Sequence, residues 1–340
     1  GEDVGQNYTY NAPGIEENAA NNFFNEISAA TGSGSTAYLG DDRATNLFGS
    51  FTNVIAGFRT TFGADKEIFL ESNTHSIVAL TDSLAVYSLI AQLDPGLDSD
   101  PSGLSTITGI LKAASNIANQ SLESIVNATG DLIGAGTKIN LDNRDELYTR
   151  IQEIEDVIFD TEGNWEPLYQ GLNISSLHNA TATELKVKAL GLSLDDPADS
   201  IAYRYALVNL NPFVITGNNA IYVSHNDNNE LELENFSEDY LTDASNFLAL
   251  KVELNEKDEI SKSSRYINSD IYRKFDDNGD LELGLTISGR GQDPQPERFF
   301  LFGGNGNDTL TGDRLGDHLY GGGGDDTINA GAGDAYAEGN

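Results

Sequence analysis

The C-terminal end of the chain is a tandem nonapeptide repeat, and it constrains the fold more than any other feature. Residues 303–311 and 321–329 match the pattern G-G-x-G-x-D-x-U-x, where U is a large apolar residue, at every fixed position. The other two units, 312–320 and 330–338, match in part. The second keeps Asp317 and Leu319 but carries Asp313 and Leu315 where glycines would sit, whereas the fourth has Ala335 in place of the aspartate. A Gly/Asp-rich linker would not hold this phase over four consecutive units.

Each unit predicts a turn that is followed by a short strand. Glycines in the turn adopt backbone angles that are closed to other residues, which lets carbonyl oxygens converge on an ion. The aspartate at the sixth position adds a carboxylate and completes an oxygen cage that suits Ca²⁺. The last three residues form a strand that points one apolar side chain inward, and these side chains are Leu310, Leu319 and Ile328. Two units complete one coil, so the first turn stacks on the third and the second on the fourth.

This stacking predicts the best calcium site between Asp308 and Asp326. The second stack has only Asp317, because Ala335 supplies no carboxylate. Without calcium the clustered aspartates repel one another and little apolar surface is available, so we expect calcium binding and folding of the tail to be one event. The metal-binding residues expected in these turns are Gly304, Asn305, Gly306, Asp308, Asp317, Gly322, Gly323, Gly324 and Asp326.

A second turn upstream of the repeats also offers oxygen ligands at alternate positions. Asp276, Asn278 and Asp280 have the i, i+2, i+4 spacing of calcium loops. The EF-hand pattern fails, because Leu281 stands at its sixth position and Ile287 at its twelfth. These three residues are therefore an additional candidate metal site, beside the alternative of an ion-free Asx-rich hairpin turn.

Charge and cysteine content exclude several classes of function. The chain has 54 Asp and Glu against 19 Lys and Arg, for a net charge of −35, so it would not bind the phosphate backbone of nucleic acid. An acidic membrane surface would repel it as well. The absence of cysteine excludes disulfides, thiolate catalysis and cysteine metal sites. No uncharged run of about 18 apolar residues occurs, so no membrane-spanning helix is expected.

The spacing of apolar residues predicts an α+β multidomain chain. Residues 1–14 read as an N-terminal arm, and residues 15–210 as a mainly α-helical domain with helices over 15–30, 68–93 and 103–135 and a further helix with its core face at Leu147, Ile151, Ile154 and Ile158. Residues 211–300 read as a small α+β connector, with strands at 213–215, 220–223 and 281–287 and a helix over 237–254. The repeats occupy residues 301–340.

At its repeats the chain resembles the RTX (repeats-in-toxin) exoproteins of Gram-negative bacteria. In that family such nonapeptides form a calcium-loaded parallel β-roll, which the resemblance implies for residues 301–340. It also implies an extracellular protein, secreted unfolded through a type I secretion apparatus that reads an uncleaved C-terminal signal. The sequence stops at Asn340 among the repeats, without such a signal, so we expect a fragment of a larger exoprotein.

A weaker likeness extends upstream of the repeats. It rests on residues 204–207, 210–213, 225–226 and 231–241, which look like a region just before the repeats of large RTX proteins. Some of those proteins carry a lipase-like domain elsewhere. The likeness therefore implies association with such proteins and no activity of its own.

The sequence thus predicts a calcium-binding, structural and secretion-coupled portion of an RTX exoprotein. One alternative is a membrane-active toxin fragment that uses the helices at 76–93 and 103–135, although ordinary core helices have the same pattern. Another is a noncatalytic part of an RTX lipase-like hydrolase. Neither the nucleophile elbow G-x-S-x-G nor the metalloprotease motif H-E-x-x-H occurs, which favours a noncatalytic role.

Overall fold

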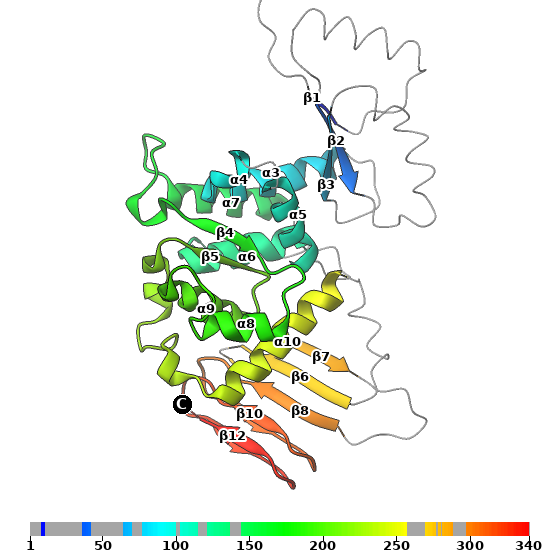
Figure 1. Cartoon of the computed structure of the whole chain (residues 1–340), viewed down its shortest axis with the longest axis vertical. Coiled ribbons are helices and arrows are strands. Elements are labelled where there is room, and N and C mark those ends of the chain that lie inside the picture. Colours follow the sequence, from blue (N-terminus) through cyan, green and yellow to red (C-terminus); the bar gives the residue numbers. More distant parts are fainter. Residues whose placement is uncertain are drawn as a thin grey trace, which may run out of the picture. The chain divides into compact units, whose positions relative to one another are not determined.

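The computed structural model shows an α+β chain with several parallel strands (Figure 1). It divides into two compact units. Residues 1–112 and 119–157 form unit 1, and residues 113–118 and 158–340 form unit 2, so the boundary predicted at residue 210 falls inside unit 2. The structure describes residues 8–10, 36–41, 64–69, 77–99, 103–114, 121–136, 144–256, 269–276, 278–279, 281–287 and 297–339.

Unit 1 begins with strands where the sequence predicts an arm and helices. Strands β1 (Tyr8–Tyr10), β2 (Thr36–Asp41) and β3 (Ala64–Phe69) form a parallel sheet in the order β1-β2-β3. The helix predicted over 68–93 is wrong at its start. Residues 68 and 69 end β3, and the helix begins at residue 77, because pairing with β2 overrides the local helical spacing. The helix predicted over 15–30 lies outside the described residues.

The helices of unit 1 bury the faces that the sequence predicts. They are α3 (Ile77–Leu93), α4 (Gly96–Ser99), α5 (Gly103–Ala114), α6 (Ser121–Ile133) and α7 (Arg144–Ile158). The segment predicted over 103–135 thus forms α5 and α6, with residues 115–120 outside the described part. On α7 the predicted face is buried throughout, at Leu147, Ile151, Ile154 and Ile158. None of the described helices has the length and apolar character needed to cross a bilayer.

Unit 2 begins with a two-stranded antiparallel sheet beside two helices. Strands β4 (Asn173–Ser176) and β5 (Phe213–Thr216) pair with each other, and α8 (Ala182–Ala189) and α9 (Ser200–Asn209) lie between them in sequence. The buried guanidinium of Arg204 on α9 donates to the carbonyl oxygens of Ala189 and Leu231. It thereby ties the end of α8 and the loop before α10 to one side chain.

The strand predicted over 220–223 is wrong, because these residues form a 3₁₀ helix, η3 (Asn219–His225). Its cause is local. Gly217 takes a φ of 95°, and the side chain of Asn218 accepts a hydrogen bond from the backbone N–H of Ala220, which caps a helical turn. The helix predicted over 237–254 is confirmed as α10 (Glu238–Glu256).

The repeats extend a mixed sheet that begins before them. Strands β6 (Ser269–Phe275), β7 (Leu281–Ile287), β8 (Glu297–Phe302), β10 (His318–Tyr320) and β12 (Tyr336–Glu338) lie in the order β12-β10-β8-β6-β7, and only the β6–β7 pair is antiparallel. Strands β9 (Thr309–Thr311) and β11 (Thr327–Asn329) form a second, parallel pair. Repeats therefore alternate between the two sheets, as the predicted coil requires.

Apolar side chains from both sheets form one small core. Leu301, Leu310 and Leu319 are at most 3% exposed, and Ile328 and Phe275 pack against them. Leu310, Leu319 and Ile328 are the side chains that the repeat pattern places inside. Each repeat strand has only three residues and so contributes a single inward side chain.

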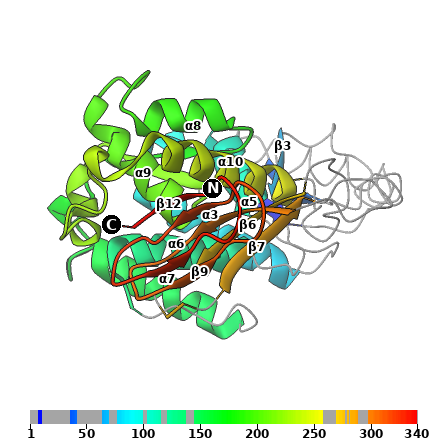
Figure 2. The ribbon, with the colours of Figure 1, turned by 90° about the horizontal axis from the view of Figure 1, so that it is seen from below.

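Helix α10 packs on the other face of the larger sheet, which Figures 1 and 2 show alongside it. The strand registers place Tyr272, Phe300, His318 and Tyr336 in one row across β6, β8, β10 and β12. The Phe247 ring of α10 lies 5.3 Å from that of Tyr272, and the Tyr240 ring lies 5.1 Å from that of Tyr320. Repeats that belong to this sheet thus carry aromatic side chains on their outer positions.

A buried carboxylate on α10 holds the same interface. Asp243 is 6% exposed, and its Oδ2 accepts hydrogen bonds from the Tyr320 hydroxyl at 2.6 Å and from Nδ1 of His318. Burial and the nearby Asp243 carboxylate raise the pKa of Tyr320, so its hydroxyl stays protonated as a donor. The contact links the second repeat to a helix about 75 residues earlier in the chain.

Removing the Tyr320 hydroxyl tests this link. We expect Tyr320→Phe to lower the free energy of unfolding by about 1–3 kcal/mol, because the buried Asp243 carboxylate loses a donor while the ring packing is kept. Chemical denaturation measures the loss. Tyr336→Phe is the matched control, since the Tyr336 hydroxyl bonds to Glu338 in a half-buried position, and it should cost no more than about 0.5 kcal/mol. Equal losses in the two variants would contradict the role given to Asp243.

Candidate metal centre

The structure stacks the turn of the first repeat on the turn of the third. The N–H of Gly323 donates to the carbonyl oxygen of Gly304 at 2.9 Å, and the N–H of Asp325 donates to the side chain of Asn307 at 2.8 Å. The backbone N–H of Asp308 donates to Oδ1 of Asp326, 18 residues later, at 2.9 Å. Two turns that lie a full coil apart in sequence therefore meet residue by residue. The predicted ligands brought together in this way are Gly304, Asn305, Gly306, Asp308, Gly322, Gly323, Gly324 and Asp326.

Glycine is required where the two turns approach each other. Gly322 has a φ of 84°, and a Cβ there would lie 2.2 Å from the carbonyl oxygen of Gly304. Gly324 has a φ of 107°, and its Cβ would lie 2.5 Å from the carbonyl oxygen of Gly306. Carbonyl oxygens of one turn thus face the backbone of the next, and such oxygens are the ligands that Ca²⁺ takes from protein backbones.

The aspartates of the two turns fold back over the starts of their own repeats. Asp308 is 2% exposed, and its Oδ2 accepts a hydrogen bond from the N–H of Gly304 at 2.7 Å. A Cβ on Gly321 would lie 2.3 Å from Oδ2 of Asp326. Among the described residues no Lys or Arg forms a salt bridge with Asp326. Two carboxylates and several carbonyl oxygens therefore gather at one stack of turns, which is the ligand chemistry of a hard cation.

Asp317 lies in the other stack of turns, apart from the site just described. It is fully buried, and its carboxylate accepts hydrogen bonds from the backbone N–H of Asp313 at 2.6 Å and of Phe299 at 2.8 Å. Within the described part of the chain it forms no salt bridge. Its turn partner carries Ala335, as the sequence indicates, so this stack offers one sixth-position carboxylate rather than two.

The turn that carries Asp276 and Asn278 lies beside the first repeat. The sequence analysis does not predict this proximity. Gly279 has a φ of 76°, and a Cβ there would lie 3.3 Å from Oδ1 of Asp308. The side chain of Asp276 accepts a hydrogen bond from the N–H of Asn278 at 2.9 Å, whereas Asp280 lies outside the described residues. The parallel register of β6 on β8 brings the two turns together, because it pairs Lys274 with Phe302, the residue before the first repeat.

Side chains alone do not make a metal centre here. Within the described ranges, no three His, Asp or Glu side chains converge in a way that could hold a metal ion. Any ion at these turns would therefore depend on backbone carbonyl oxygens, whose convergence is set by the glycines.

Comparisons with protein-family models, with curated proteins and with solved structures find no match to the chain.

The need for glycine at the stacked turns can be tested directly. We expect Gly322→Ala to destabilise the repeats by about 2 kcal/mol or more, since alanine disfavours a positive φ and its Cβ would meet the carbonyl oxygen of Gly304. Thermal unfolding followed by circular dichroism is the measurement. Gly339→Ala is the control, because a Cβ there meets nothing within 4 Å. An unchanged midpoint for Gly322→Ala would show that the turns do not stack as described.

Proposed function

We propose that residues 301–340 are a calcium-binding β-roll of the RTX kind, and that the chain is the calcium-dependent structural part of a secreted protein. One observation carries the proposal. The strands pair at an offset of 18 residues, and this offset brings Asp308, Asp326 and the carbonyl oxygens of two glycine-rich turns together. The carboxylate at the sixth position of the first three repeats also accepts backbone N–H groups, and in the proposal it serves both the turn and the ion.

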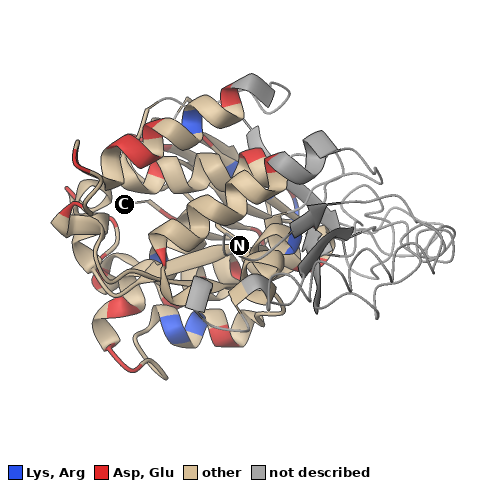
Figure 3. Cartoon of the chain, turned by 90° about the horizontal axis from the view of Figure 1, so that it is seen from above, with Lys and Arg blue, Asp and Glu red and all other residues tan. Residues whose placement is uncertain are grey.

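The charge of the chain supports a cation as the missing partner. The sequence has 54 acidic against 19 basic residues, and the ribbon in Figure 3 marks acidic positions on several helices and loops. Buried carboxylates are costly unless a cation or hydrogen-bond donors compensate them. Two backbone N–H groups already donate to the buried carboxylate of Asp317, so it is the acidic excess of the chain that favours a cation. Calcium supplies two positive charges and accepts several oxygen ligands at once. In the proposal, ion binding offsets the repulsion and sets the turns.

Calcium would act beyond the repeats through helix α10. Strands β10 and β12 belong to the repeats, and they provide part of the aromatic face on which Tyr240 and Asp243 of α10 pack. If the turns require calcium to form, this part of the face forms only with calcium. The repeats would then be an assembly element for unit 2 as well as a store of ions.

The same coupling suits export of an unfolded chain. Extracellular calcium modules bind with dissociation constants of about 10⁻⁴–10⁻³ M, so the repeats would remain unfolded in a low-calcium cytosol and fold outside. The RTX resemblance supplies the rest of this proposal, namely a Gram-negative source, a type I secretion apparatus as partner and an extracellular location. The proposed role is structural, and no catalytic residue is assigned.

A calcium titration with charge-neutral variants tests the proposal. We expect calcium to increase the β signal of the wild-type chain in circular dichroism, and we expect the double variant Asp308→Asn with Asp326→Asn to lose most of this response. Asparagine keeps the size of the side chain and removes the charge that the ion requires. Calorimetry should report a dissociation constant at least about tenfold weaker in the double variant.

Asp325→Asn is the matched control for this titration. It removes one negative charge, against two in the double variant, next to Asp326 and at an exposed position that the repeat pattern leaves free. We expect its calcium response to stay close to that of the wild type. If the double variant titrates like the control, Asp308 and Asp326 do not bind the ion. If the wild type shows no response up to about 10 mM calcium, the proposed function is wrong.

A further inference from the structure

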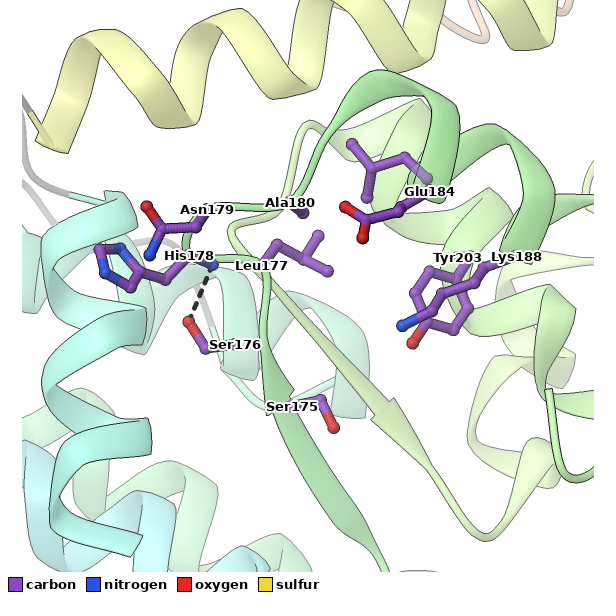
Figure 4. A pocket seen from close by; sticks show the side chains of 10 residues that line it. Ser175, Ser176, Leu177, His178, Asn179, Ala180, Glu184, Lys188 and Tyr203 are labelled. Atoms are coloured by element: carbon purple, nitrogen blue, oxygen red, sulfur yellow. Dashed lines mark hydrogen bonds between the residues drawn. The ribbon is translucent and has the colours of Figure 1, made fainter. Parts of the chain in front are cut away.

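A surface pocket of unit 2 lies where the end of β4 meets helices α8 and α9, outside the repeats (Figure 4). Its volume is about 230 Å³. Buried Leu177, Leu185 and Tyr203 line it together with polar side chains, and these three residues are at most 5% exposed. The exposed lining is more polar than apolar, and the pocket is smaller than the roughly 300–1,000 Å³ of pockets for drug-sized ligands, so it suits a small polar molecule.

Lys188 gives the pocket a cation that forms no salt bridge among the described residues. Its Nζ lies 5.1 Å from the centroid of the Tyr203 ring, and no described carboxylate lies within salt-bridge distance of it. Lys186, two residues earlier on α8, behaves differently, because its Nζ contacts Glu238 and Thr242 at 2.9 Å each. In a chain with 54 acidic residues, a lysine that faces a pocket without a carboxylate partner is available to an anionic ligand.

The acidic residue of this pocket, Glu184, already accepts two hydrogen bonds from Thr181. Oε2 of Glu184 accepts hydrogen bonds from the backbone N–H of Thr181 at 2.9 Å and from its hydroxyl at 2.7 Å, which caps helix α8. These two hydrogen bonds, and to a smaller extent the charge of Lys188, hold the pKa of Glu184 below its usual range. Glu184 therefore stabilises the start of the helix and leaves the ammonium of Lys188 without a direct partner.

Two hydroxyl groups complete the polar side of the pocket. The ring of Tyr203 is buried, yet its hydroxyl has no hydrogen-bond partner among the described residues, and the ammonium of Lys188 lies over this ring (Figure 4). The hydroxyl of Ser175, at the end of β4, is likewise without a described partner and also lines the pocket. An ammonium and a phenolic hydroxyl side by side are donors that match the two oxygens of a carboxylate.

We propose that this pocket binds a small organic carboxylate. Lys188 and Tyr203 donate to the carboxylate oxygens, and Ser175 hydrogen bonds to a neighbouring polar group of the ligand. The volume restricts the ligand to about the size of an amino acid or a single sugar acid. This binding site is independent of the calcium turns.

Calorimetric titration of the full chain in saturating calcium tests the proposal with three probes. D-glucuronate represents a hydroxy acid, L-serine represents an amino acid, and D-glucose is a sugar without a carboxylate. We expect one of the two carboxylates to bind with a dissociation constant of roughly 1–10 mM and glucose to bind at least about tenfold more weakly. The carboxylate that binds more tightly shows whether the ligand is a hydroxy acid or an amino acid. Equal binding of glucose and glucuronate would contradict a carboxylate site.

Variants locate the binding within the chain. Lys188→Gln and Tyr203→Phe should each lower the affinity for the tighter-binding carboxylate at least about fivefold, because each variant removes one hydrogen-bond donor to the ligand. Lys186→Gln removes a charge from the same helix outside the pocket and should leave the affinity within about twofold. Unchanged thermal midpoints exclude unfolding as the cause. The proposal fails if neither carboxylate binds up to about 50 mM, or if Lys186→Gln weakens binding as much as Lys188→Gln.

Discussion

The repeat region depends on carboxylates that join one coil to the next. Oδ2 of Asp317 accepts an N–H from its own turn, and Oδ1 accepts the N–H of Phe299 from the previous coil. Asp326 accepts the N–H of Asp308 in the same way on the other stack. A side chain at a fixed position thus fixes both the shape of a turn and the register of its neighbour. The same groups carry negative charge into places with little exposure, and in the proposed function a calcium ion offsets this charge.

Packing alone would not hold these coils. The strands of the first two repeats each bury one leucine, whereas Ile328 in the third is half-buried and Ala337 in the fourth is exposed. This is little apolar burial to offset the entropy of ordering the repeats. Two further contributions are visible. One is the convergence of oxygen atoms that a calcium ion would bind, and the other is helix α10, whose rings at Tyr240 and Phe247 cover the outer face of the larger sheet.

Features that the repeat pattern sets could be predicted from the sequence, whereas features that depend on pairing with another part of the chain could not. The glycines and aspartates fix the phase, so the inward positions of Leu310 and Leu319 and the coil offset could be foreseen. The core face of α7 followed from its helical period in the same way. The 3₁₀ helix at 219–225 could not, because its apolar residues also suit a strand and the cap from Asn218 decides the outcome. The position of Gly279 beside Asp308 depends on a strand register that no local pattern contains.

The fourth repeat shows that the turn and core positions of a repeat vary independently of its outer positions. It has lost the carboxylate at Ala335 and the large inward residue at Ala337, so it contributes little to an ion or to the core. It keeps Tyr336, whose ring lies 5.7 Å from that of His318 and continues the outer row. The odd repeats show the opposite pattern, because Thr309 and Thr327 are exposed on the outside while their turns keep the glycines and the aspartate. In the proposed function the turn positions serve calcium binding, whereas the outer positions of the even repeats pack against other elements on the larger sheet.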